Sequence, residues 1–211
     1  MEALKCDRNN LSCFNNLLVL YLFNASSFSS SFGTEEKLCL YVENSLQKII
    51  SLDPQQKYYQ SLINHYIING KYFSNIYEKN VLLSKIENLY SKFLDLDDQN
   101  PVSYINLGGF YLTNNDYYYY KNSKFNLFEK TEGLFLNAFK LSKEQDCKYC
   151  CYAKLALAIL YNQYMGRPQE ALKLYKEALN ELEINPETFT PITKVEILED
   201  IQEITSKSRA V

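Results

Sequence analysis

The chain has 211 residues, of which 46% are hydrophobic, and it carries a formal net charge of −3. This length suits one domain or one short stack of repeats, and the apolar content is sufficient for a core. A protein that binds nucleic acid normally carries a basic stripe for the phosphates, so the charge balance argues against that class. No stretch reaches the ~18 apolar residues of a membrane span, although peripheral association with a membrane stays open.

The N-terminal region contains one apolar run, from Leu17 to Phe23, that resembles the apolar part of a signal peptide. Glu2 and Asp7 in its leader, and the polar pair at 15–16, favour an amphipathic helix over a secretion signal. We therefore expect residues 1–34 to hold an amphipathic helix and a Ser-rich linker. This interpretation places the protein in the cytoplasm, with the cytosolic face of a membrane as one version.

The cysteines are scattered, without the regular spacing of a disulfide framework: Cys6, Cys13, Cys39, Cys147, Cys150 and Cys151. A chain of this length does not need disulfides for stability, so reduced thiols are the expectation. The cluster from Cys147 to Cys151 looks like half a zinc site, but no second closely spaced pair of ligands completes it. We expect no metal and no cofactor.

Two segments of the chain align at an offset of 45 residues. Their shared positions are Tyr59, Leu62, Ile63, Tyr66 and Gly70 in the first segment, and Tyr104, Leu107, Gly108, Tyr111 and Asn115 in the second. The spacing i, i+3, i+4, i+7 indicates one face of a helix. The same offset also pairs 85–96 with 130–141, so it relates two successive helices and predicts a tandem repeat.

A third and shorter copy spans Leu155 to Leu179. Its first helix has Leu157, Ala158 and Tyr161, and its second has Ala171, Tyr175 and Ala178. This arrangement resembles the tetratricopeptide repeat (TPR), in which small residues let two helices approach and aromatic residues fill the spaces between repeats. The resemblance covers residues 35–204 and implies an all-α, right-handed α-solenoid of TPR-like helix pairs, with about nine helices.

The resemblance also assigns the residues that should pack the repeats together. They are Tyr59, Leu62, Tyr66, Tyr104, Leu107, Gly108, Tyr111, Ala158, Tyr161, Ala171, Tyr175 and Ala178. The TPR period is 34 residues, so the first two copies each contain 11 extra residues, near 71–82 and 117–128. In the third copy, Gly166 comes one residue late relative to Tyr161. We expect the two insertions to form loops or helix extensions on one face.

The domain organisation follows from these repeats. A lone repeat-type helix should occupy 35–55, three TPR-like repeats should occupy 56–100, 101–145 and 146–186, and a capping helix and tail should occupy 187–211. We expect the capping helix to bury the stripe formed by Ile192, Val195, Leu198, Ile201 and Ile204.

No set of catalytic side chains accompanies the repeats. His65 is the only histidine, and we interpret it as a residue of the helix surface or groove, because no Ser or Cys nucleophile pattern accompanies it. The resemblance offers one test of partner class. TPR proteins that hold the acidic tails of heat-shock chaperones use cationic side chains, whereas the corresponding positions here are Gln60, Tyr152 and Ala156. We therefore reject a chaperone carboxylate clamp.

The leading hypothesis is a non-catalytic scaffold or adaptor that binds a partner peptide or helix in a concave groove. The expected groove residues are Gln60, Asn64, Ile67, Ile105, Asn106, Gly109 and Thr113. The layout of stretched helix pairs near a C-terminal helix also resembles the cytosolic TPR subunit of the endoplasmic-reticulum membrane protein complex. A secreted effector with disulfides is the third hypothesis, which thiol titration would separate from the other two.

Overall fold

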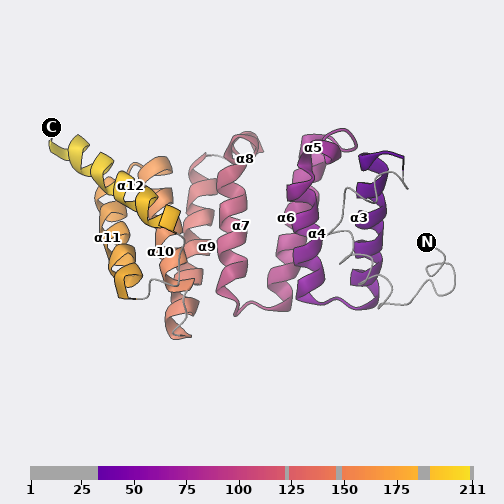
Figure 1. Cartoon of the computed structure of the whole chain (residues 1–211), viewed down its shortest axis with the longest axis horizontal. Coiled ribbons are helices and arrows are strands. Elements are labelled where there is room, and N and C mark those ends of the chain that lie inside the picture. Colours follow the sequence, from indigo (N-terminus) through magenta and orange to yellow (C-terminus); the bar gives the residue numbers. More distant parts are fainter. Residues whose placement is uncertain (1–32, 122–123, 146–148, 185–190, 210–211) are drawn as a thin grey trace. The chain divides into compact units, whose positions relative to one another are not determined.

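The computed structural model describes residues 33–121, 124–145, 149–184 and 191–209, and within these ranges every regular element is a helix. The chain divides into two compact units, Met1–Asp97 and Asp98–Val211. The boundary follows the last helix of the first unit, close to the repeat boundary expected at residue 100. Unit 1 is coloured from indigo to magenta and unit 2 from magenta to yellow in Figure 1. No helix among the described residues is both long and apolar enough to cross a membrane.

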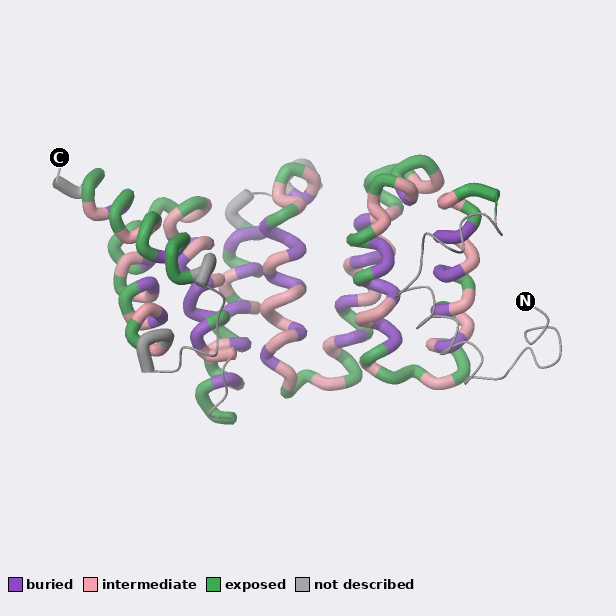
Figure 2. Tube along the Cα trace, in the orientation of Figure 1, coloured by how far each residue is buried: buried purple, intermediate pink, exposed green. Residues whose placement is uncertain are grey.

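Unit 1 contains α3 (Glu35–Leu52), α4 (Gln56–Ile68), the short α5 (Gly70–Phe73) and α6 (Lys79–Leu96). Helix α3 begins at the N-cap Thr34, whose hydroxyl accepts a hydrogen bond from the backbone N–H of Lys37 at 3.3 Å. Helices α3 and α6 both pack on α4. The buried residues therefore lie on the faces that these helices turn toward each other (Figure 2).

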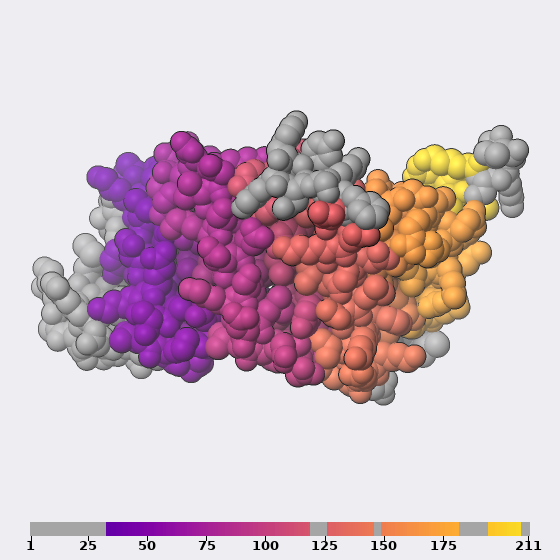
Figure 3. All heavy atoms as spheres, turned by 180° about the vertical axis from the view of Figure 1, so that it is seen from behind, coloured from indigo at the N-terminus to yellow at the C-terminus, as the bar shows by residue number. Residues whose placement is uncertain are grey.

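Unit 2 contains α7 (Pro101–Thr113), α8 (Asn115–Lys121), α9 (Lys124–Glu144) and α10 (Tyr149–Ile159). A π-helical turn, η1 (Leu160–Tyr164), continues α10, and α11 (Pro168–Ile184) and α12 (Pro191–Arg209) complete the unit. Helices adjacent in sequence pack together, from α7 on α9 to α11 on α12. The sequence colours in Figure 3 accordingly run in order within each unit.

Each of the two insertions contains a short extra helix that packs at the end of a helix pair. In unit 1, Phe73 of α5 is fully buried and meets Tyr66 edge to face, with 4.9 Å between ring centres. In unit 2, Tyr118 of α8 meets Tyr111 in the same way at 5.0 Å. Both pairs are related by the 45-residue offset. The insertions are therefore part of the repeat, and they extend its aromatic core.

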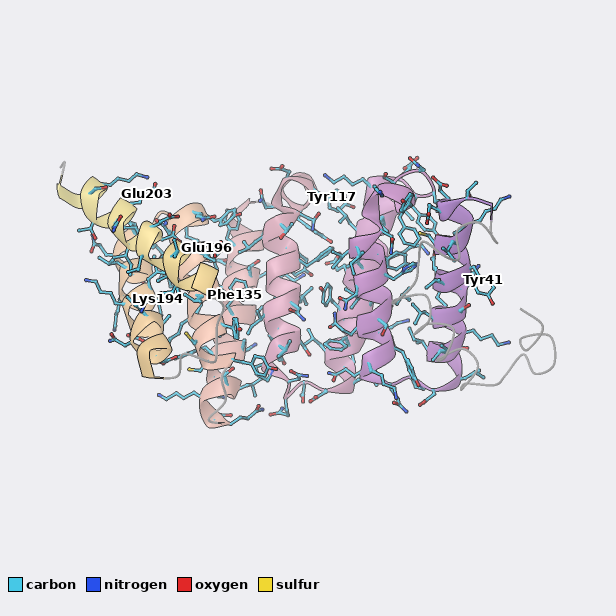
Figure 4. The ribbon with its side chains drawn as sticks, in the orientation of Figure 1. Tyr41, Tyr117, Phe135, Lys194, Glu196 and Glu203 are labelled. Atoms are coloured by element: carbon cyan, nitrogen blue, oxygen red, sulfur yellow. The ribbon has the colours of Figure 1, made fainter. Side chains whose placement is uncertain are left out.

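The structure describes two side chains of the tyrosine run 117–120, both on α8. Tyr118 is core, while Tyr117 is half-buried and lies on α8 beyond the end of α7 (Figure 4). The side chains of residues 119–125 lie outside the described part of the chain, as does the apolar run at 17–23.

The capping helix α12 packs on α11 with a different stripe from the one expected. Ile197 and Ile204 are buried and Ile201 is half-buried, whereas Val195 and Leu198 are exposed. The expected stripe was therefore wrong for Val195 and Leu198. Both stripes fit a helical period, and the choice between them depends on how α12 lies on α11.

Candidate binding groove

Unit 2 contains a groove of about 260 Å³ between α7 and α10, the first helices of two successive pairs. Its lining residues are Ile105, Gly109, Leu112, Thr113, Phe135, Ala156, Ile159 and Tyr164. None of these side chains carries a charge. The Thr113 hydroxyl donates to the Gly109 carbonyl oxygen at 2.9 Å, so its hydrogen bond is satisfied within α7. We name this site the α7–α10 groove.

The glycine pair Gly108-Gly109 shapes the α7–α10 groove from two sides. A Cβ atom on Gly108 would clash with the ring of Phe135, so the absence of a side chain lets α9 approach α7 closely. A Cβ atom on Gly109 would meet nothing within 4 Å, so the second glycine leaves open space. The absence of a side chain at Gly108 therefore allows close packing in the core, and its absence at Gly109 leaves space in the groove.

The π-helical turn η1 places Tyr164 at the edge of the groove. Its characteristic bond is donated by the Met165 N–H to the Leu160 carbonyl oxygen, at 3.1 Å, and this turn accommodates the extra residue noted before Gly166. The Tyr164 ring then lies 5.4 Å from the ring of Phe128 on α9. Single π turns often occur at functional sites because they re-aim side chains.

A polar cluster at Glu132 of α9 holds this turn in place. The Tyr161 hydroxyl donates to Glu132 Oε1 at 2.6 Å, and Arg167 Nη1 donates to the same oxygen at 2.8 Å. The guanidinium of Arg167 also lies 4.1 Å from the centre of the Tyr161 ring, which is the geometry of a cation–π contact. Burial, and then the bond to Glu132, raise the pKa of Tyr161 to about 12.

The structure places the seven expected groove residues in two groups. Ile105, Gly109 and Thr113 line the α7–α10 groove, while Asn106 is half-buried and is not among its lining residues. The other three lie in unit 1 on the side of α4 away from its buried stripe: Gln60, Asn64 and Ile67. There the Gln60 amide donates to Asn64 Oδ1 at 2.8 Å, and Ile67 is 53% exposed.

The residues assigned to repeat packing are mostly buried. Those buried are Tyr59, Leu62, Tyr66, Leu107, Gly108, Tyr111, Ala158, Tyr161, Ala171, Tyr175 and Ala178. Tyr104 is half-buried, because its hydroxyl reaches out to the Asp98 carbonyl oxygen at 3.0 Å. The sequence pattern therefore lies mostly on the interior faces of the helices.

His65 is not a surface or groove residue, so that interpretation was wrong. Its side chain is 3% exposed, and its Nε2 lies 3.0 Å from the Cys39 carbonyl oxygen of α3. Burial lowers the pKa of His65, which favours the neutral ring. The residue links α3 to α4 and is positioned for packing.

A buried carboxylate in unit 1 was not expected from the sequence. Glu43 of α3 is 2% exposed, and its carboxylate accepts hydrogen bonds from Tyr66 at 2.6 Å, from Tyr77 at 2.8 Å and from Lys85 at 2.9 Å. The Gln47 amide also donates to it at 3.1 Å. These donors come from every main element of the unit, so Glu43 fixes how α3, α4 and α6 fit together.

The cysteines near the start of α10 contribute to packing. Cys151 is buried and its thiol lies 3.5 Å from the Ala178 carbonyl oxygen; burial raises its pKa to about 12. Cys147 lies outside the described residues. Among the residues that the structure does describe, no group of three or more His, Cys, Asp or Glu side chains is placed to hold a metal ion.

Comparison with known proteins finds similarity in structure rather than in sequence. No family model and no curated protein matches the chain. The structure of MamA is similar over 88% of this chain and 86% of its own, with 18% identity and a TM-score of 0.59. A thermophilic TPR protein from Thermus thermophilus is similar over 89% of this chain and 92% of its own, with 16% identity and a TM-score of 0.50.

A third similar structure is a putative kinesin light chain from Podospora anserina with nearly identical TPR-like repeats. It is similar over 96% of this chain and 98% of its own, with 12% identity and a TM-score of 0.55. At these identities the similarity establishes the fold alone. It confirms the prediction from the repeat pattern: the chain is an all-α solenoid of the TPR type.

Proposed function

We propose that the protein is a non-catalytic interaction scaffold that binds a segment of a partner protein in the α7–α10 groove. The observation that carries this proposal is the lining itself, which combines apolar side chains from α7, α9, α10 and η1 without a charged group. Such a surface recognises shape and apolar area. The TPR-type fold supports the proposal as a scaffold that presents a groove between helix pairs.

The proposed partner segment is a peptide or helix that places one bulky apolar side chain in the groove. A volume of about 260 Å³ suits one or two side chains rather than a small-molecule cofactor, which usually occupies about 300–1,000 Å³. Because the lining lacks charge, the affinity should depend weakly on salt concentration. Asn64 and Ile67 on α4 belong to unit 1 and form a separate candidate surface there.

The test is selection of 12-residue peptides from a random display library on the full chain. We expect the selected peptides to share a bulky apolar residue and to bind Ile105→Glu about tenfold or more weakly, since the substitution places an unpaired charge against apolar surface. Leu136→Glu is the matched control, because Leu136 is 45% exposed on α9 and does not line the groove. Equal binding to all three proteins would move the site elsewhere.

The two other hypotheses stay proposals with their own tests. Membership of a membrane-associated complex, such as the endoplasmic-reticulum membrane protein complex, would appear as co-purification with integral membrane subunits. A secreted effector would lose thiols to disulfides. Free thiols would support a cytoplasmic scaffold, and their absence would support the secreted effector. Titration of the unfolded chain counts all six cysteines and decides between these two.

A further inference from the structure

Unit 1 contains a second groove, of about 470 Å³, with a chemistry different from that of the α7–α10 groove. Its floor consists of buried residues of α4, namely Tyr59, Leu62 and Tyr66. One side comes from Gln47, Ile50 and Ser51 of α3, and the other from Lys85, Asn88, Leu89 and Lys92 of α6. We name this site the α3–α6 groove.

The lining of the α3–α6 groove includes two ammonium groups and no carboxylate. Lys85 and Lys92 are seven residues apart on α6, so they lie on one face about 10 Å apart along the helix axis, with Leu89 between them. The chain as a whole carries a net charge of −3. Because Glu43 neutralises Lys85, Lys92 supplies the uncompensated positive charge among the lining residues, and this charge attracts an anionic group.

The two lysines differ in what they can offer to a ligand. Lys85 is already bound to Glu43, which is buried behind it and is itself saturated with hydrogen bonds. Lys92 is exposed, and no hydrogen bond or ion pair of its ammonium group is found with the described residues. Lys92 is therefore the group that is available to an incoming anion, while Lys85 and Glu43 keep the wall of the groove rigid.

We propose that the α3–α6 groove binds an acidic peptide segment of a partner protein, with a carboxylate on Lys92 and an adjacent apolar side chain on Leu89, Ile50 and Tyr59. The groove offers both an apolar floor and an ammonium group. It therefore favours a ligand that has both an apolar side chain and a negative charge. This site is independent of the α7–α10 groove, since the two share no residue and differ in charge.

The experiment selects peptides from the same random 12-residue display library on the full chain. The binding of each selected peptide to variants of the protein is then measured. We expect one class of peptides to carry Asp or Glu beside a bulky apolar residue and to bind Lys92→Glu about tenfold more weakly, the factor expected for loss of one charge-assisted hydrogen bond. These peptides should bind less tightly at 500 mM than at 50 mM NaCl and should bind Ile105→Glu normally.

Lys79→Glu is the matched control, because Lys79 is exposed on the same helix, undergoes the same change of charge and does not line the groove. Circular dichroism of each variant checks that the helices form. An acidic class that binds Lys92→Glu and Lys79→Glu equally well would overturn the proposal, as would the absence of an acidic class. Loss of binding to Ile105→Glu alone would support the α7–α10 groove and overturn this one.

Discussion

A Cβ atom on Gly108 would lie 2.3 Å from Cε1 of Phe135, well inside the van der Waals contact distance. Phe135 is 1% exposed on α9, so its ring has little room to move (Figure 4). The distance shows that α7 and α9 approach each other as closely as the TPR pattern implies for a small residue at this position. Among the glycines of the described residues, Gly108 is the one at which an added Cβ atom would clash.

Replacing Gly108 by alanine should destabilise the protein by about 1–3 kcal/mol, because the new methyl group overpacks against Phe135. Gly133→Ala is the matched control, since a Cβ atom there would meet nothing within 4 Å and the position is exposed on α9. That change should be neutral or stabilising by up to about 1 kcal/mol through helix propensity. Urea unfolding measures both; equal free energies of unfolding would contradict the close approach.

Removing the buried carboxylate of Glu43 should lower the stability of unit 1. In Glu43→Ala the Tyr66 hydroxyl loses its partner while buried, which alone costs about 1–3 kcal/mol. Lys85 is about one-third exposed and can turn to water, so its lost ion pair adds little. Tyr77→Phe, which removes a single donor, should cost about 1 kcal/mol or less.

Thermal unfolding followed by circular dichroism compares these two variants with the native protein. The order of stability should be native, then Tyr77→Phe, then Glu43→Ala. If Glu43→Ala unfolds at the same temperature as the native protein, the carboxylate does not fix the fit of the helices.

Much of the fold could be predicted because the repeat was visible twice at one offset. Tyr66 and Tyr111 fall on equivalent helix faces, and both are buried. The extra helices α5 and α8 were placed correctly as insertions, but their helical form was one of two options. Their packing depends on Phe73 and Tyr118, which the 45-residue offset pairs; this pairing was a usable signal for a shared structural role.

The candidate sites were harder to predict, because they depend on contacts between helices. Ile105, Gly109 and Thr113 could be named from the helix period, but Tyr164 reaches the groove only through a π turn that propensities do not indicate. Glu43 was missed although it lies one turn from Cys39 and three residues from Leu46, both buried. A carboxylate at such a position on an apolar helix face is a signal for a buried polar partner.

The two cysteines at the start of α10 should differ strongly in reactivity. Burial raises the pKa of the Cys151 thiol to about 12, so little thiolate exists at pH 8, and access is blocked. Cys150 is only half-buried. Iodoacetamide labelling of the native protein at pH 8, mapped by mass spectrometry, should modify Cys150 at least about tenfold faster than Cys151. Equal rates would mean that α10 and α11 open readily.

Stability should decline at alkaline pH, in part because of Tyr161. The folded-state pKa of this residue, about 12, lies above the ordinary value of 10. A raised pKa of an acid means that the folded state keeps its proton longer, so the stabilisation is fully present below pH 10 and is lost as the pH rises from 10 to 12. Deprotonation would break the bond to Glu132 and place two negative charges together, which releases the turn that carries Tyr164.

The free energy of unfolding, measured by urea denaturation at pH 9 and pH 11.5, should therefore fall less in Tyr161→Phe than in the native protein. The expected difference between the two declines is about 1–2 kcal/mol, which is the scale of a shift of this size for a largely buried phenol. Tyr152→Phe is the control for loss of a tyrosine hydroxyl, because Tyr152 is 37% exposed and lies outside the Glu132 cluster. If the free energy of unfolding falls as steeply in Tyr161→Phe as in the native protein, other titrating groups cause the alkaline loss of stability. The hydrogen bond from the Tyr161 hydroxyl to Glu132 would then not be what stabilises η1.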